Sequence, residues 1–286
     1  MKIIIYFVEY IVVKILFFIF KIIGYKNSSN LGFLIGKYFG PLFRSKSLIK
    51  DNLIQANISD KNNFDLIATN VLGNYGRIFS EYVFLKDFRN EKLANYISIN
   101  GQKYLDDIIK KQKKVVFISG HFNNFELMAM QLEKYGVNLT AIYRPLNNIF
   151  LNKTMEKIRT HFICRKQIKK GRSGSRELVK NFKEGSSIAL MIDQRVREGI
   201  SVPFFQKSCS TTTIPAQLVK KYECEIVPIY IERKKNHFFE MTVSQPLVFN
   251  KSLSIDDISV ELNKILEKMI LKNLDQWIWT HNRWQK

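Results

Sequence analysis

The sequence predicts an α/β fold in which a mixed β-sheet is flanked by helices and preceded by an N-terminal membrane-anchor helix. Three observations predict it. Residues 3–23 are almost wholly apolar, residues 31–112 carry apolar side chains at helical spacing, and from residue 115 onward short β-prone runs alternate with helical segments. Strands that alternate with helices are typical of a sheet covered by helices. We therefore expect an anchor at residues 1–23 and one domain at residues 24–286.

Residues 3–23 are long enough to cross a bilayer, because a spanning helix needs roughly 20 apolar residues. Glu9, Lys14 and Lys21 interrupt the segment, so that spanning the membrane and lying in its interface are nearly balanced. A buried core helix is the remaining alternative. No small-residue cleavage site follows, which argues against a cleaved signal peptide. Under the positive-inside rule, the basic residues that follow place the domain on the cytoplasmic side. These residues are Lys26, Lys37, Arg44, Lys46 and Lys50.

Segments 31–39 and 66–79 are the clearest helices of the first half, since their apolar residues recur at helical spacing. Asp60 is a candidate N-terminal cap before the second of them. In the second half, short runs of β-prone residues predict strands, and longer runs with helical period predict helices. The predicted strands are residues 115–118, 139–143, 187–192, 226–231 and 238–243. The predicted helices are residues 127–132, 214–222 and 255–270.

The composition is that of a folded and strongly basic chain. Of its 286 residues, 46% are hydrophobic, which suffices for a sizeable core and argues against disorder. The net charge is +20, so we expect an acidic partner: nucleic acid, an anionic membrane, or an acidic protein or substrate. Cys164, Cys209 and Cys224 are too scattered for a disulfide framework, which predicts free thiols in a reducing compartment.

Polar residues gather where three of the predicted strands end. The stretch 121–126 follows the first of these strands, Arg144 follows the second, and Asp193 and Gln194 follow the third. Sites in open α/β sheets lie beyond the carboxyl ends of the strands, so we expect these residues to converge on one site. Asp193 and Gln194 either polarise that site or order the end of the sheet.

The stretch 120–126, Gly-His-Phe-Asn-Asn-Phe-Glu, places His121 and Glu126 five positions apart at a strand-to-helix turn. A neutral imidazole can take a proton from an attacking hydroxyl, and a carboxylate on its far nitrogen fixes the tautomer. A helix that starts near Asn123 would also offer N–H groups to developing negative charge. The same residues allow a structural interpretation, in which Glu126 only reaches back to Asn123 as a capping box.

This stretch resembles the H-x4-(D/E) signature of the bacterial lipid A biosynthesis acyltransferases, the late lauroyl and myristoyl transferases. Further blocks match the family in the same order across nearly the whole chain, and the ordered set is more specific than any one block. The blocks are the anchor, Arg44 with Asn52 and Leu53, residues 142–148, Arg159, residues 185–194, residues 202–212 and residues 276–284. Gln206 and Cys209 depart from the family pattern, which would alter the shape of the acyl pocket.

The resemblance implies a glycerolipid-acyltransferase-like fold and transfer of an acyl chain from acyl carrier protein to a hydroxyl of a lipid A precursor. The reaction would occur at the cytoplasmic face of the bacterial inner membrane. It further implies His121 as general base, Glu126 as the group that orients it, and Arg159 as donor to the oxyanion. The two arginines, Arg159 and Arg144, could exchange roles. The implied substrate-binding residues are Arg144, Asn147, Asp193 and Gln194. No metal and no diffusible cofactor are required, because the phosphopantetheine arrives with the carrier protein.

Acidic partners of this kind, together with an anionic membrane, would explain the net charge, and the basic stretch 169–180 is a candidate contact for them. A nucleic-acid-binding protein would fit the charge, but the apolar N-terminus and the lack of a recognisable binding motif oppose it. A metal hydrolase is opposed by the four histidines, which show no metal-ligand spacing. Among acyltransferases, the alternative acceptor is a lysophospholipid or a glycosylated phospholipid.

Overall fold

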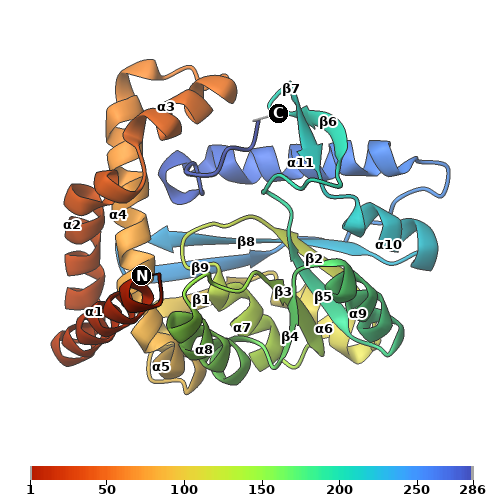
Figure 1. The fold of residues 1–286 in the computed structure, drawn as a ribbon. Coiled ribbons are helices and arrows are strands. Elements are labelled where there is room, and N and C mark those ends of the chain that lie inside the picture. Colours follow the sequence, from red (N-terminus) through yellow and green to blue (C-terminus); the bar gives the residue numbers. More distant parts are fainter. Residues whose placement is uncertain (1, 285–286) are drawn as a thin grey trace.

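The computed structural model describes residues 2–284 and places a central sheet between two groups of helices, with a further helical layer at one end (Figure 1). The end layer consists of α1 (Lys2–Ile23), α2 (Tyr25–Phe43), α3 (Lys46–Gln55) and α4 (Phe64–Glu81). Above the sheet in Figure 1 lie α10 (Ile214–Tyr222) and α11 (Ile255–Lys272). Below it lie α5 (Leu85–Arg89), α6 (Gln102–Lys110), α7 (Glu126–Lys134), α8 (Ile149–Ile158) and α9 (Arg172–Lys183). Short 3-10 segments are η1 (Lys61–Asn63), η2 (Tyr82–Phe84), η3 (Ala94–Tyr96) and η5 (Leu274–Gln276), and η4 (Arg159–Ile163) is π-helical.

The main sheet has seven strands in the order β1-β9-β8-β2-β5-β3-β4. They are β1 (Ile97–Asn100), β2 (Val116–Ser119), β3 (Leu139–Tyr143), β4 (Lys166–Lys169), β5 (Ser187–Met191), β8 (Ile226–Lys234) and β9 (Phe238–Val243). The neighbours from β8 to β4 run parallel, whereas β9 is antiparallel to β8 and β1 runs parallel to β9. The sheet is therefore mixed and flanked by helices, which confirms the predicted fold class. A separate hairpin, β6 (Ile200–Phe204) with β7 (Lys207–Thr211), packs against α11 through β6.

Most predicted elements are confirmed, and β3, β9 and α10 have the predicted bounds. The prediction that residues 31–112 are helical is wrong at β1, because a four-residue edge strand is too short to reveal its period. Asp60 does not cap α4. A 3-10 turn stands between them, and the carboxylate of Asp60 accepts a hydrogen bond from the side chain of Asn63 (2.6 Å). The three cysteines are free thiols, as predicted.

Helices α2 and α4 approach each other closely because glycines lie at their contact. A Cβ atom at Gly36 would lie 2.2 Å from the carbonyl oxygen of Leu72, and one at Gly76 would lie 1.9 Å from the carbonyl oxygen of Gly32. Both obstacles are backbone atoms, which cannot turn aside as a flexible side chain can. The contact between the two helices therefore has no room for a side chain at these positions.

We expect Gly36→Ala to destabilise the protein, since the added methyl group meets the backbone of α4. Overpacking of this kind costs about 1–3 kcal/mol, which exceeds the roughly 1 kcal/mol that alanine gains over glycine inside a helix. Gly40→Ala on the same helix is the matched control, because its Cβ would meet only the side chain of Leu72, at 3.1 Å. Thermal unfolding in detergent should show a lower midpoint for Gly36→Ala alone. Equal midpoints for the two variants would contradict the close approach.

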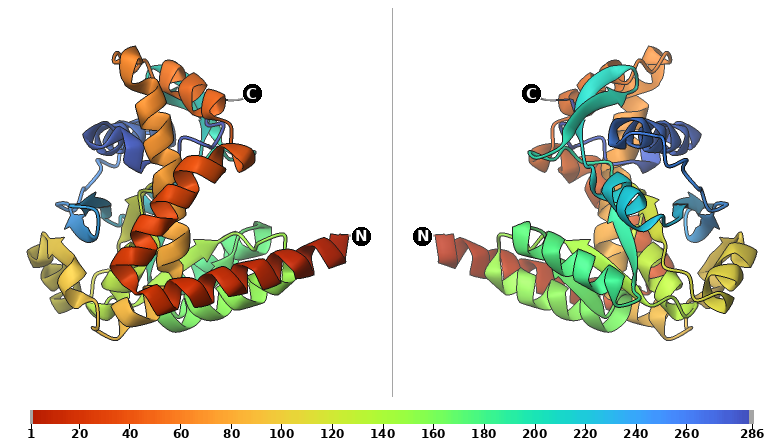
Figure 2. Two further views of the ribbon diagram at one scale, coloured as in Figure 1. Left: turned by 90° about the vertical axis from the view of Figure 1, so that its left-hand side faces the viewer. Right: turned by 90° about the vertical axis from the view of Figure 1, so that its right-hand side faces the viewer.

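Helix α1 lies alongside α8 on the outside of the domain (Figure 2). Within residues 2–284 it is the one helix long and apolar enough to cross a membrane, and 6% of its most apolar window is buried. The side chain of Asn148, at the start of α8, donates hydrogen bonds to the carbonyl oxygen of Tyr6 (2.8 Å) and the carboxylate of Glu9 (2.9 Å). Lys21 pairs with Asp87. Glu9 is therefore partnered, and anchoring in a membrane stays a prediction.

Candidate active site

Strands β2 and β5 deliver His121 and Asp193 to the same place at the carboxyl edge of the sheet. In their parallel register, Ser119 at the end of β2 lies opposite Met191 at the end of β5. Each of the two site residues follows two positions later, so they emerge side by side. Arg144, which follows β3 at the same edge, is exposed.

The imidazole of His121 is paired with the carboxylate of Asp193. Nδ1 of His121 lies 2.8 Å from Oδ1 of Asp193. Oδ2 accepts the backbone N–H of His121 (2.7 Å) and the indole N–H of Trp277 (2.9 Å). Because an ionised carboxylate can only accept, Nδ1 carries the proton, and in the neutral imidazole Nε2 has the free lone pair. The prediction that Glu126 makes the orienting hydrogen bond to His121 is therefore wrong, since Asp193 makes it.

The predicted substrate-binding residues differ in how deeply they are buried. Asp193 is fully buried behind His121, so its predicted contact with substrate is corrected to a contact with the histidine. Gln194 is half-buried beside it, while Arg144 and Asn147 are exposed at the surface. The neighbouring Asn148 has a structural role, since its side chain also accepts the first N–H groups of α8.

The surroundings of His121 set its pKa in opposing directions. Burial lowers the pKa of the imidazole, but the charge and hydrogen bond of Asp193 outweigh burial, and the pKa lies above its usual value. Burial also raises the pKa of Asp193, whereas His121 and the hydrogen bonds to its carboxylate lower it overall. The ring of Phe125 packs edge-on against the imidazole, with 4.7 Å between the ring centres. The His121 side chain keeps 20% of its surface exposed, so a substrate can reach it.

Glu126 forms a largely buried ion pair with Arg159. Its Oε1 accepts hydrogen bonds from Nε (2.9 Å) and Nη2 (2.8 Å) of Arg159 and from the hydroxyl of Tyr82 (3.2 Å). Burial raises the pKa of Tyr82 well above its usual value, and the charge of Glu126 raises it further, so this hydroxyl stays a donor. The capping-box interpretation also fails, because α7 begins at Glu126 and has no side-chain cap. The N–H of Asn123 donates instead to the carbonyl oxygen of Gln276 (3.0 Å).

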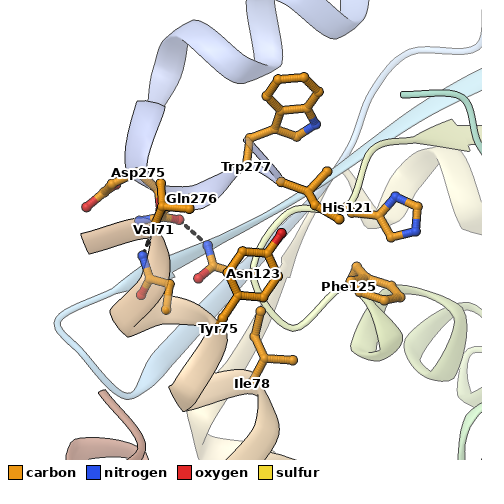
Figure 3. A pocket seen from close by; sticks show the side chains of 11 residues that line it. Val71, Tyr75, Ile78, His121, Asn123, Phe125, Asp275, Gln276 and Trp277 are labelled. Atoms are coloured by element: carbon orange, nitrogen blue, oxygen red, sulfur yellow. Dashed lines mark hydrogen bonds between the residues drawn. The ribbon is translucent and has the colours of Figure 1, made fainter. Parts of the chain in front are cut away.

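His121 borders a hollow between α4, the loop after β2 and the C-terminal segment (Figure 3). The hollow has a cavity volume of about 30 Å³ and is open to solvent. It is lined by Val71, Asn74, Tyr75, Ile78, His121, Asn123, Phe125, Asp275, Gln276, Trp277 and Ile278. Figure 3 shows Trp277 and Phe125 on either side of the approach to His121. Within residues 2–284, no group of three or more His, Cys, Asp or Glu side chains is arranged to hold a metal ion.

A buried ion pair that the sequence analysis missed holds the loop carrying His121. Nη1 and Nη2 of Arg233, on β8, donate to the two carboxylate oxygens of Glu81, at the end of α4 (2.7 and 2.9 Å). Nε of Arg233 donates to the side chain of Asn123 (3.3 Å), and the side chain of Asn124 donates to Glu81 (3.3 Å). The only signals in the sequence were two charged residues within apolar segments, which do not reveal each other as partners.

We expect Arg233→Met to destabilise the protein by about 3–5 kcal/mol, because it leaves the carboxylate of Glu81 buried without its partner. Lys234→Met is the matched control one position along the strand, since the side chain of Lys234 is half exposed and its partner Glu232 also accepts a hydrogen bond from Asn273. Denaturant unfolding should separate the two variants clearly. A second change, Glu81→Leu, should recover stability in the Arg233→Met background. Failure of the double variant to recover would show that Glu81 is not the group left unpaired.

A parallel sheet edge that carries a histidine–carboxylate pair beside an arginine–glutamate pair fits an enzyme that activates a hydroxyl for acyl transfer. The family profile described as "Bacterial lipid A biosynthesis acyltransferase" matches residues 1–286, and the chain belongs to that family.

Relatives with this description have low sequence identity to the chain. The lipid A biosynthesis lauroyltransferase of Escherichia coli is 23% identical over 206 residues, which cover 68% of this chain and 64% of that protein. A lipid A biosynthesis acyltransferase of Haemophilus influenzae is 21% identical over 234 residues, covering 79% and 72% of the two chains. The crystal structure of the 1-acyl-sn-glycerophosphate acyltransferase PlsC from Thermotoga maritima aligns with 93% of this chain and 97% of its own, with 12% identity and a TM-score of 0.41.

Proposed function

We propose that this protein transfers a fatty acyl chain from acyl carrier protein to a hydroxyl of a lipid A precursor, at the cytoplasmic face of the bacterial inner membrane. The family supports the lipid and the reaction class. The observation that carries the mechanism is the His121–Asp193 pair, which leaves one ring nitrogen with a free lone pair next to an open hollow. The reaction uses no metal and no diffusible cofactor.

His121 acts as the general base. Nε2 takes the proton of the acceptor hydroxyl while the hydroxyl oxygen attacks the thioester carbonyl carbon of the donor. The resulting imidazolium donates from Nδ1 to Asp193, whose buried carboxylate stabilises the positive charge. When the tetrahedral intermediate collapses, the carbon–sulfur bond breaks and the thiolate recovers the proton from Nε2. The products are an ester and the free thiol of the carrier's phosphopantetheine.

Arg159 donates to the oxyanion of the tetrahedral intermediate. Its ion pair with Glu126 uses Nε and Nη2, which leaves Nη1 outside that pair. Glu126 therefore serves as a positioning residue for Arg159. A fixed cation next to the developing charge lowers the barrier because it needs no reorganisation during the reaction.

Exposed positive charge near the site favours anionic substrates and partners. Arg144, which is exposed after β3, binds a phosphate of the acceptor in this proposal, with Asn147 and Gln194 as further polar contacts. Lys169 and Lys170 are exposed where β4 ends, and Lys170 bonds through its backbone to the end of β3. An acidic carrier protein would be attracted to this surface.

Mass spectrometry of the lipid product tests the proposal. Purified full-length protein is incubated with a lipid A precursor and acyl-loaded carrier protein, and the precursor should gain the mass of one acyl chain. Transfer to a lysophospholipid or a glycosylated phospholipid but not to the precursor would keep the chemistry and replace the acceptor. If the folded protein transferred no acyl chain to any lipid, the proposed acyltransferase activity would be refuted.

A further inference from the structure

A second cavity lies between α1 and the helices α4 and α8 of the domain. Its cavity volume is about 160 Å³, and it is partly open to solvent. Val13 and Phe17 of α1 form one wall, and Leu151 and Met155 of α8 form the opposite wall. The surfaces that meet there are predominantly apolar, which favours an apolar occupant over water.

Tyr82 links this cavity to the groups assigned to the reaction. Tyr82 lines the cavity, and its hydroxyl donates a hydrogen bond to Glu126 (3.2 Å). Glu126 pairs with Arg159, which directly follows α8 in the chain. One side chain therefore separates the cavity from the ion pair that includes the proposed oxyanion donor.

The wall contributed by α1 is held in place rather than loosely apposed. The ring of Phe17 packs on Phe79 of α4 with 5.2 Å between ring centres, and Phe7 packs on Phe150 of α8 at 5.6 Å. The hydrogen bonds from Asn148 fix the same helix further along its length. The cavity is therefore part of the folded protein, and α1 is both a candidate anchor and one of its walls.

We infer that this cavity binds the acyl chain of the donor, and that Val13, Phe17 and Met155 limit the length of chain that the protein accepts. The inference rests on the proposed acyl transfer. Each methylene group removed from water favours binding by roughly fourfold. A cavity wall that excludes the end of a chain therefore discriminates strongly against longer donors.

The position of Tyr82 favours the donor chain over a chain of the acceptor. The carbonyl under attack belongs to the donor, so its chain starts beside the oxyanion donor, Arg159. An acceptor that carries phosphates and sugars needs a site open to solvent, and the hollow beside His121 is open to solvent. The cavity lined by Tyr82 thus suits the donor chain, and the hollow beside His121 suits the acceptor.

Chain-length selectivity tests this assignment. Decanoyl, dodecanoyl, tetradecanoyl and hexadecanoyl carrier proteins are compared as donors with one acceptor. Val13→Trp narrows the cavity, and loss of contact with two methylene groups should lower kcat/KM for the longest accepted chain, relative to decanoyl, by roughly 15-fold. Met155→Ala widens it and should shift the preference toward longer chains.

Val12→Trp is the matched control, because Val12 lies on the same helix with 50% of its surface exposed and does not line the cavity. Its chain-length preference should match that of the wild type. If Val13→Trp lowered kcat/KM equally for all donors, or if Val12→Trp and Val13→Trp changed the chain-length preference equally, the assignment of this cavity to the donor chain would be wrong. The proposed acyl transfer would be unaffected.

Photo-crosslinking tests the binding site without relying on turnover. A carrier protein bearing an acyl chain with a terminal diazirine is irradiated with the full-length protein, and the labelled peptides are identified by mass spectrometry. Labels on α1 and α8 near Val13 and Met155 are expected. Labels elsewhere would refute the inference even if no acceptor were acylated, so its failure is distinguishable from failure of the proposed function.

Discussion

His121→Ala is expected to lower acyl transfer by about 10²–10⁴-fold while the protein remains folded, because loss of a general base has an effect of this size. The imidazole contributes its free Nε2 to the reaction, and its packing partner Phe125 remains. Single-turnover transfer of a radiolabelled acyl chain, measured at saturating donor and acceptor, reports this step directly. Thermal unfolding in detergent verifies that the variant is folded.

His161→Ala is the matched control for that variant. His161 is exposed, and Nδ1 of its ring is 2.8 Å from the carbonyl oxygen of Lys157 on the preceding helical turn. Its removal should change transfer by less than about twofold, as surface substitutions usually have small effects. If His121→Ala kept most of its activity, the proton would have to leave through another group and the mechanism would fail.

The fold could be predicted from sequence where an apolar run or a regular apolar period marked the element. Strand β3, helix α10 and strand β9 have bounds that their apolar runs defined. The missed strands were four to five residues long: β1 and β4 at the two edges of the sheet, and β6 and β7 of the hairpin outside it. Helices α8 and α9 were also missed. Edge strands alternate between exposed and buried side chains over so few residues that they resemble loops.

The sequence predicted that His121 and Asp193 lie close together, but not that they are hydrogen-bonded to each other. The convergence of His121 with Asp193, the residue after β5, followed from the rule for parallel sheets. Glu126 was paired with His121 because both lie in one short motif, whereas the register of β2 and β5 brings Asp193, 72 positions away, to Nδ1 of the imidazole. His121 and Asp193 have equal offsets only from the observed strand ends, Ser119 and Met191, because the predicted strands ended at residues 118 and 192.

Asp193→Asn is expected to lower kcat/KM by about 10²–10⁴-fold at pH 8, because the neutral amide no longer stabilises the imidazolium that forms during proton transfer. It should also change the pH profile. His121 must be neutral to accept a proton, so the rate falls as the pH drops through its pKa. Asp193 holds that pKa above its usual value, and without this charge burial lowers it. The acid limb of the profile should therefore move to lower pH in the variant.

If Asp193 had only a structural role, Asp193→Asn would lower the maximal kcat/KM without moving the acid limb of the pH profile. The pH profile therefore distinguishes a structural role from an electrostatic effect on His121. Glu126→Gln is the comparison that decides between the carboxylates. Glu126 also raises the pKa of His121, but its contribution is smaller than that of Asp193, and its hydrogen bonds go to Arg159 and Tyr82. The acid limb of the pH profile should therefore move less in Glu126→Gln than in Asp193→Asn. A larger shift for Glu126→Gln would restore the pairing suggested by the motif, and it would mean that the protein rearranges when its substrates bind.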